Sequence, residues 1–223
     1  MNLSGKNILV VGVSGVLGSH IANLLAAQGA RVLGTATSNE SAARMPEAIA
    51  TRLLLDLESP ESIKTLGDYL VGSEKLDGVV LAAGRVGFGR LDSTPAAAAS
   101  RLTQINYLGQ ADLAARLLPA MNPESFLAAI TGVVAERTFP GMASYCASKT
   151  ALSTWLAASN SEFRRAGVQV IEARPGHTET GLATRPLFGE APNMPTGMTA
   201  EHVASKIVEA IVSRTALLAS TDF

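Results

Sequence analysis

The chain opens with a short apolar run that leads into three regularly spaced glycines. Asn7–Val11 is mostly leucine and β-branched residues, which is the composition of a strand buried on both faces of a parallel sheet. Gly12, Gly15 and Gly18 then lead into a helix predicted at Val16–Gln28. Glycines at such a turn let the backbone approach a pyrophosphate, and the first amides of the helix attract its charge. A tight turn without a ligand is the alternative, but the strand-to-helix context favours dinucleotide binding.

Strand-like and helix-like segments alternate through the rest of the chain. Further strands are expected at Ala30–Thr35, Leu53–Leu55, Asp77–Leu81, Ser125–Ile130, Val168–Ala173 and Ala216–Ala219. Helices are expected at Ser41–Ala50, Pro60–Leu70, Pro95–Met121, Ala143–Ala166 and Thr199–Ser213. The alternation predicts an α/β fold with a doubly wound parallel sheet in three α/β/α layers, a Rossmann fold. We expect a single NAD(P)-binding domain across residues 1–223, with an irregular substrate loop at about 176–198.

Composition excludes several classes of function. A net charge of −1 over 223 residues gives no broad field for nucleic acid or an anionic membrane. The single cysteine, Cys146, rules out an internal disulfide, and neither a signal peptide nor a long apolar segment is recognisable. We therefore expect a soluble cytoplasmic protein. Three scattered histidines and one cysteine lack metal-ligand spacing, so no metal is expected.

Tyr145 and Lys149 stand four residues apart in a segment suited to a helix, so their side chains share one face. A fixed ammonium near a phenol favours the phenolate and lowers the phenol's pKa. The pair would then exchange protons with a carbonyl or an alcohol. Alone the spacing is a weak signal, because a solvated lysine one turn after a half-buried tyrosine is common.

Seven short motifs strengthen that interpretation. They are V-G-V-S-G-V-L-G at Val11–Gly18, R-V-L-G-T-A-T-S at Arg31–Ser38, L-D-L at Leu55–Leu57, L-A-A-G at Leu81–Gly84, I-N-Y at Ile105–Tyr107, Y-C-A-S-K at Tyr145–Lys149 and R-P-G-H-T-E-T at Arg174–Thr180. In this order they resemble the short-chain dehydrogenase/reductase family of classical type over essentially the whole chain. The nearest resemblance is to the bacterial β-ketoacyl carrier-protein reductases.

The resemblance implies an oxidoreductase that interconverts a small-molecule carbonyl and an alcohol by hydride transfer. Tyr145 would be the proton donor, and Lys149 would tune it and hold the nicotinamide ribose. Asn106 would organise a proton path from Lys149 to solvent. Asn106 is a poor residue for a helix interior, so either a local distortion or a functional role is expected there, with an ordinary exposed amide as the alternative.

The same resemblance implies a set of cofactor-binding residues. The set comprises Gly12, Ser14, Gly15, Leu17, Gly18, Thr37, Ser38, Asp56, Leu57, Ala82, Ala83, Gly84, Tyr145, Lys149, Pro175, Gly176, Thr178 and Thr180. Asp56 would bind the adenine amino group, although a helix N-terminal carboxylate is the alternative. Pro175 and Gly176 also suit a turn that binds nothing.

The end of the second strand favours NADP over NAD. An acidic residue there would bind the adenosine ribose hydroxyls and repel a 2′-phosphate, whereas Thr37 and Ser38 are polar and uncharged. The family's usual phosphate-pairing arginine is absent from the glycine turn, where Gly15 stands in its neighbourhood.

The chain departs from the family at the catalytic serine, because Gly132 occupies that position. Losing such a hydroxyl typically costs on the order of 10²–10³ in rate. Thr131 is one residue away and completes the catalytic set with Tyr145, Lys149 and Asn106, if the strand ends early enough to turn its hydroxyl into the site. The departure also admits a second hypothesis, a non-catalytic NAD(P)-binding homologue that acts as a sensor or partner subunit.

Four polar residues near the expected substrate site have no settled role. His177 would assist proton transfer, bind a polar substrate group or make a structural hydrogen bond. Arg85, Arg90 and Arg185 would meet an anionic substrate tail or remain solvated loop charges. The substrate itself is not predicted. The resemblance also implies a homodimer or homotetramer.

Overall fold

The computed structural model describes residues 1–73 and 75–223. Its main sheet has seven parallel strands in the order β3-β2-β1-β4-β5-β6-β9. They are β1 (Asn7–Val11), β2 (Arg31–Ala36), β3 (Thr51–Leu54), β4 (Leu76–Leu81), β5 (Met121–Ile130), β6 (Gln169–Ala173) and β9 (Leu217–Leu218). The order reverses between β1 and β4, and in open α/β sheets ligands bind beyond the carboxyl ends of the strands at such a point. The predicted doubly wound sheet is confirmed.

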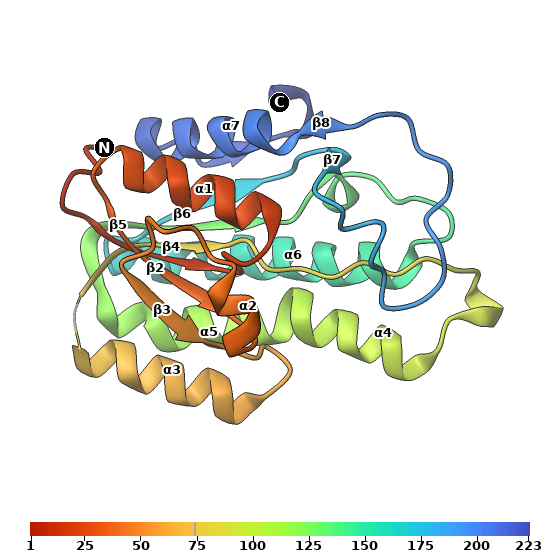
Figure 1. Cartoon of the computed structure of the whole chain (residues 1–223), viewed down its shortest axis with the longest axis horizontal. Helices are drawn as coiled ribbons and strands as arrows, with labels where there is room; N and C mark the ends of the chain where they lie inside the picture. The colour runs from red at the N-terminus through yellow and green to blue at the C-terminus, as the bar shows by residue number, and fades with distance from the viewer. Residues whose placement is uncertain (74) are drawn as a thin grey trace.

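Helices cover both faces of this sheet (Figure 1). The helices are α1 (Val16–Ala27), α2 (Asn39–Ala43), α3 (Pro60–Ser73), α4 (Ala96–Thr103), α5 (Gly109–Leu117), α6 (Ala143–Arg165) and α7 (Ala200–Ser213). Short 3₁₀ segments occupy Leu91–Ser93, Leu118–Ala120, Val133–Ala135 and Ser220–Asp222. The layers are those of an α/β/α sandwich.

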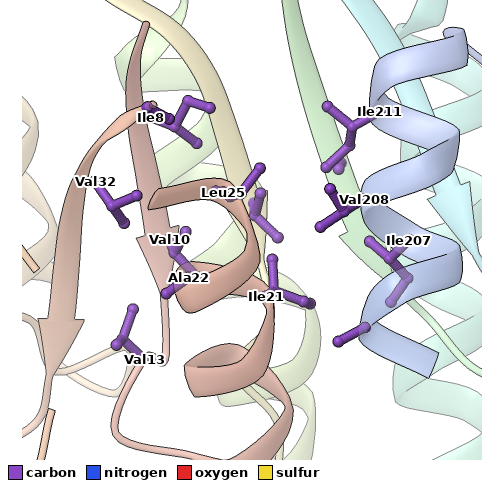
Figure 2. Packing of buried hydrophobic residues seen from close by; sticks show 14 of the residues in the cluster. Ile8, Val10, Val13, Ile21, Ala22, Leu25, Val32, Ile207, Val208 and Ile211 are labelled. Atoms are coloured by element: carbon purple, nitrogen blue, oxygen red, sulfur yellow. The ribbon is translucent and has the colours of Figure 1, made fainter. Parts of the chain in front are cut away.

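Two apolar clusters hold the layers together. On one face α1 packs beside α7, and Figure 2 shows Ile21 and Leu25 of α1 opposite Ile207 and Ile211 of α7. Side chains of α3, α5 and α6 form the second cluster against the other face. Both clusters consist mainly of buried aliphatic side chains, and full burial of one leucine, isoleucine or valine stabilises the fold by about 1.5–3 kcal/mol. No helix within residues 1–73 and 75–223 is long and apolar enough to cross a membrane.

The prediction of one continuous helix at Pro95–Met121 is wrong. This segment is divided into α4, a π-helical turn at Gln104–Leu108, and α5, and the chain already enters β5 at Met121. The distortion expected at Asn106 is therefore confirmed. The helix expected at Ser41–Ala50 ends after Ala43, before Pro46, which has no amide hydrogen for a helical hydrogen bond.

The irregular segment after β6 is braced at both of its ends. Strand β7 (Thr178–Glu179) pairs with β8 (Met198–Thr199), and the residues between them, 180–197, are called the lid here. The lid also pairs with the chain after β4, because the Leu187 amide donates to the Val86 carbonyl (2.8 Å) and the Phe88 amide donates to the Phe188 carbonyl (3.0 Å). The segment after β4 and the lid therefore form one unit beyond the carboxyl edge of the sheet.

Candidate active site

The glycine turn after β1 is packed too closely for larger residues. Gly12 has φ +90°, and a Cβ there would lie 2.9 Å from the backbone of Ala83. A Cβ on Gly18 would lie 2.4 Å from the Gly12 carbonyl oxygen. The Gly12 amide donates to the Thr35 hydroxyl at 3.1 Å, which ties the turn to β2. Packing alone therefore accounts for Gly12 and Gly18.

The other side of this turn is open. Ser14, Gly15 and Val16 are exposed at the start of α1, while Leu17 is half-buried. The backbone amides at the start of α1 are thus accessible, which is the arrangement that receives a phosphate group. The turn therefore fits the pyrophosphate of a dinucleotide.

The remaining residues expected to bind cofactor follow the carboxyl ends of other strands. Thr37 and Ser38 follow β2, Asp56 and Leu57 lie just beyond β3, Ala82–Gly84 follow β4, and Pro175, Gly176, Thr178 and Thr180 follow β6. Parallel strands end at one edge, so these segments lie on the same side of the sheet as the glycine turn. Their roles toward a cofactor stay predictions.

Several of these groups already have protein partners. The Asp56 carboxylate accepts a 2.9 Å hydrogen bond from the Glu58 amide, next to the start of α3. This contact matches the alternative role of Asp56, a carboxylate near a helix N-terminus. Leu57 is buried, and its carbonyl accepts a hydrogen bond from Gln104. The Thr178 hydroxyl donates to the Gly176 carbonyl at 3.0 Å.

Lys149 and Asn106 converge on Gly84. A Cβ on Gly84 would lie 3.3 Å from Lys149 Nζ and 3.4 Å from Asn106 Oδ1, so both polar groups approach the backbone after β4. Lys149 is 5% exposed, and Nζ donates to the Ile130 carbonyl at 2.8 Å. Burial lowers the pKa of Lys149 to about 8. The side chain is thus poised to exchange a proton near neutral pH.

Asn106 uses its whole amide group to link three elements. Its Oδ1 accepts from the Arg85 amide (2.8 Å), and its Nδ2 donates to the Arg85 carbonyl (2.8 Å) and to Ser148 Oγ (3.0 Å). Ser148 Oγ in turn donates to the Tyr145 carbonyl at 2.8 Å. Asn106 therefore fixes the segment after β4 against the first turn of α6. The proton path expected through Asn106 stays a prediction.

Tyr145 is held as a neutral phenol in this structure. Burial raises the pKa of Tyr145 to about 12, with a smaller contribution from Cys146. The lowering expected from Lys149 is not found, because the Lys149 nitrogen donates to the Ile130 carbonyl at the end of β5 instead. A neutral phenol is the form that donates a proton.

Gly132 adopts a backbone conformation that is open only to glycine. Its φ is +86° and its ψ is 166°, a region in which other residues pay about 1–3 kcal/mol. A Cβ would still have room, with its nearest contacts at 3.6 Å and 3.9 Å. A serine at this position would therefore be strained by the backbone and not by a lack of space.

Thr131 does not take the place of that serine. It is fully buried, and its hydroxyl donates to Glu172 Oε1 of β6 at 2.6 Å. β5 ends at Ile130, as the expectation required, but the Thr131 side chain then contacts the neighbouring strand. This contact argues against the catalytic role predicted for Thr131.

Sequence reasoning missed three residues that shape the site. Ser148 joins Asn106 to Tyr145, and its position inside the Y-C-A-S-K motif was an available signal. Gln110 is buried and donates to the carbonyls of Ala83 and Ile105, which fixes the π-helical turn beside the chain after β4. Glu172 accepts hydrogen bonds from Thr131 and from Arg174, and no local sequence pattern indicates this cluster of three side chains.

The polar residues around the expected substrate site, called the rim here, differ in their surroundings. Arg90 pairs with Asp92 at 3.2 Å, and Arg185 donates to the carbonyls of Gly181 and Thr180. His177 Nε2 lies 3.3 Å from Glu179 Oε1 and borders a cavity of about 570 Å³ within the lid. Cys146 is a buried free thiol. No cluster of three metal-ligating side chains occurs in the part of the chain that the structure describes.

Comparison with known proteins agrees with this geometry. The profile of the short chain dehydrogenase family matches residues 6–187. An uncharacterised oxidoreductase of Escherichia coli, YbbO, is 32% identical over 179 residues, which cover 78% of this chain and 66% of that protein. The E. coli 3-oxoacyl-[acyl-carrier-protein] reductase FabG is 28% identical over 230 residues, covering 100% and 93% of the two chains.

Solved structures agree in fold. A Burkholderia cenocepacia short chain dehydrogenase in complex with NADP has a TM-score of 0.84 at 19% identity, covering 98% of this chain and 89% of the other. A Burkholderia phymatum short chain dehydrogenase/reductase in complex with NAD has a TM-score of 0.86 at 21% identity, covering 99% and 90%. The chain belongs to the short-chain dehydrogenase/reductase family.

Proposed function

We propose that the protein is an NADP-dependent reductase of a small carbonyl compound, with Tyr145 as the proton donor. The convergence of Lys149 and Asn106 beside Gly84, with Asn106 joined through Ser148 to the turn of α6 that carries Tyr145, supports this most directly. A protein that only held a nucleotide would not need a phenol and an amine at this position.

The chain's own residues have distinct parts in this chemistry. Bound NADPH supplies the hydride that reduces the carbonyl carbon. Tyr145, as a neutral phenol, donates the proton that the new alkoxide requires. Lys149, with its pKa near 8, restores that proton from solvent. Asn106 positions the backbone of Arg85 and, through Ser148, the first turn of α6.

The surroundings of Thr37 support the choice of NADP. Its hydroxyl is exposed beyond β2 and has no hydrogen-bond partner within residues 1–73 and 75–223. Ser38 instead caps α2, because its hydroxyl accepts from the Ser41 amide. The nearest following acid, Glu40, pairs with Arg44 at 3.1 Å. An uncharged donor that no acid flanks directly suits a 2′-phosphate better than free ribose hydroxyls.

The test is steady-state oxidation of NADPH with a panel of aldehydes and ketones. Replacing Tyr145 by Phe removes the proposed acid and is expected to lower kcat by about 10²–10⁴-fold. Tyr69→Phe is the matched control, because Tyr69 is an exposed residue of α3. Undiminished turnover in Tyr145→Phe would eliminate the proposed acid.

Gly132 supports a second candidate, a nucleotide-binding protein without turnover. Its backbone conformation disfavours, by about 1–3 kcal/mol, the serine that would hold the substrate oxygen together with the tyrosine. Tight NADPH binding with no turnover on any carbonyl would favour this candidate. A homodimer or homotetramer in the cytoplasm remains our expectation, and a monomer by light scattering at micromolar concentration would contradict the assembly.

A further inference from the structure

Arg85 is placed between the proposed catalytic groups and the lid. Its backbone amide and carbonyl both bond to Asn106, and its neighbour Gly84 lies against Lys149. Its side chain extends in the other direction, where Nη2 donates to the Arg185 carbonyl of the lid at 3.3 Å. A group bound by the Arg85 guanidinium would therefore lie beside the lid, in the region expected for the substrate.

The Arg85 guanidinium has one buried nitrogen, Nε, without a hydrogen-bond partner among the described residues. The contact to the Arg185 carbonyl is the one side-chain hydrogen bond that Arg85 makes within residues 1–73 and 75–223. No carboxylate of these residues lies within ion-pair distance of it. A guanidinium has five N–H donors, and a buried unsatisfied donor costs about 1–3 kcal/mol.

The other arginines of the rim do not share this state. Arg90 is exposed and pairs with Asp92 through Nε and Nη2, at 3.2 Å each. Arg185 donates to two carbonyls of its own loop. Arg85 is thus distinguished by a buried, partnerless nitrogen and by its link to the proposed catalytic groups. These observations set it apart from an ordinary solvated loop charge.

We propose that Arg85 binds a carboxylate on the substrate, so that the protein reduces aldehydes or ketones that carry an acid group. A planar guanidinium matches a carboxylate and binds it most strongly where water is scarce. The half-buried Phe188 ring, packed onto Gly87 two residues after Arg85, provides an apolar neighbour for the substrate's carbon skeleton. This inference rests on the proposed function for the position of the reacting carbonyl.

The test compares two aldehydes that differ in one charge, 4-carboxybenzaldehyde and methyl 4-formylbenzoate, with NADPH as reductant. Wild type is expected to show at least about 10-fold higher kcat/KM for the acid. Arg85→Gln is expected to remove that preference mainly through KM and to leave the ester unchanged. Arg85→Lys should keep part of the preference, and Arg90→Gln, the matched control, should keep all of it.

Two further measurements distinguish failure of this inference from failure of the proposed function on which it rests. The Kd of NADPH is expected to be the same in wild type and Arg85→Gln, and a loss of cofactor affinity would overturn the assignment to substrate. Calorimetric titration of benzoate into the NADP⁺-saturated protein needs no turnover. Benzoate binding to wild type but not to Arg85→Gln supports the inference even if neither aldehyde is reduced. Absence of reduction would count against the proposed function alone. Equal kcat/KM for both aldehydes, or no benzoate binding to wild type, overturns the inference.

Discussion

Thr131 donates a 2.6 Å hydrogen bond to Glu172, a residue 41 positions away on the neighbouring strand β6. Glu172 is 8% exposed and also accepts two hydrogen bonds from Arg174, whose Nη2 in addition reaches Ser153 Oγ of α6. Burial acts to raise the pKa of Glu172, but the bonds from Arg174 and Thr131 outweigh it and the pKa is lowered. The cluster joins β5, β6 and α6 directly beneath the proposed site.

Thr131→Val is expected to destabilise the fold by about 1.5–3 kcal/mol, because it removes a hydrogen bond to a buried carboxylate. Catalysis should fall little, since the hydroxyl contacts Glu172 and not the site. Thr131→Ser keeps the hydroxyl and serves as the control. Urea unfolding measures the first effect and NADPH oxidation the second. A large drop in kcat with unchanged stability would restore Thr131 to the catalytic set.

Gly132→Ser is expected to destabilise the protein by about 1–3 kcal/mol without restoring the family's catalytic hydroxyl, because the backbone at Gly132 suits only glycine. Gly132→Ala carries the same backbone cost and no hydroxyl. The two variants should therefore have similar stability and similar turnover. If the serine variant exceeds the alanine variant about tenfold in kcat, the hydroxyl does reach the substrate.

Lys149 makes stability depend on pH in an alkaline range. Its pKa is about 8 in the folded chain and 10.5 without burial, so the unfolded chain holds the proton longer as the pH rises. Stability therefore increases with pH above about 8, by at most about 1.4 kcal/mol per pH unit from this one group. In Lys149→Met this rise should disappear. Urea unfolding of both proteins between roughly pH 7.5 and 9.5 measures this rise, and parallel stability curves would contradict the assignment.

Thr37→Asp is expected to reverse the cofactor preference. A carboxylate at this position repels a 2′-phosphate and accepts bonds from ribose hydroxyls. The Kd of NADPH should rise about tenfold or more, which corresponds to about 1.4 kcal/mol, while that of NADH should stay the same or fall. Thr37→Asn controls for size without charge. Fluorescence titration gives both constants for each variant, and clearly tighter NADH binding to wild type would overturn the choice of NADP.

The fold was largely predictable because its strands are continuous apolar runs. β1 matches its prediction at both ends, and β4 and α6 differ from theirs by one residue. β5 is the exception, since it begins at Met121 instead of Ser125. Its first part contains Pro123 and Glu124, the latter with φ +67°, and pairs with β4 through a register shift. A proline followed by a residue in the left-handed conformation is not typical of a strand. The extension of β5 depends on its pairing with β4, which the local sequence does not indicate.

The site was predictable where its geometry is local to one helix. The spacing of Tyr145 and Lys149 places them on the same face of α6, and Asn106 stood out because it is a poor helix residue. The direction of Lys149 Nζ, toward the Ile130 carbonyl, was not predictable because it depends on how β5 packs against α6. The same holds for Thr131, whose partner lies on another strand.

The π-helical turn at Gln104–Leu108 gives this chain an uncommon sensitivity to length. Such a turn holds one residue more than regular α-helical winding would. Shortening α4–α5 by one residue would thus restore regular winding and rotate the downstream side chains by about 100° around the axis. Gln110 would swing off the Ala83 carbonyl, and Asn106 would lose its registry with Arg85. In this segment the count of residues matters as much as their identity.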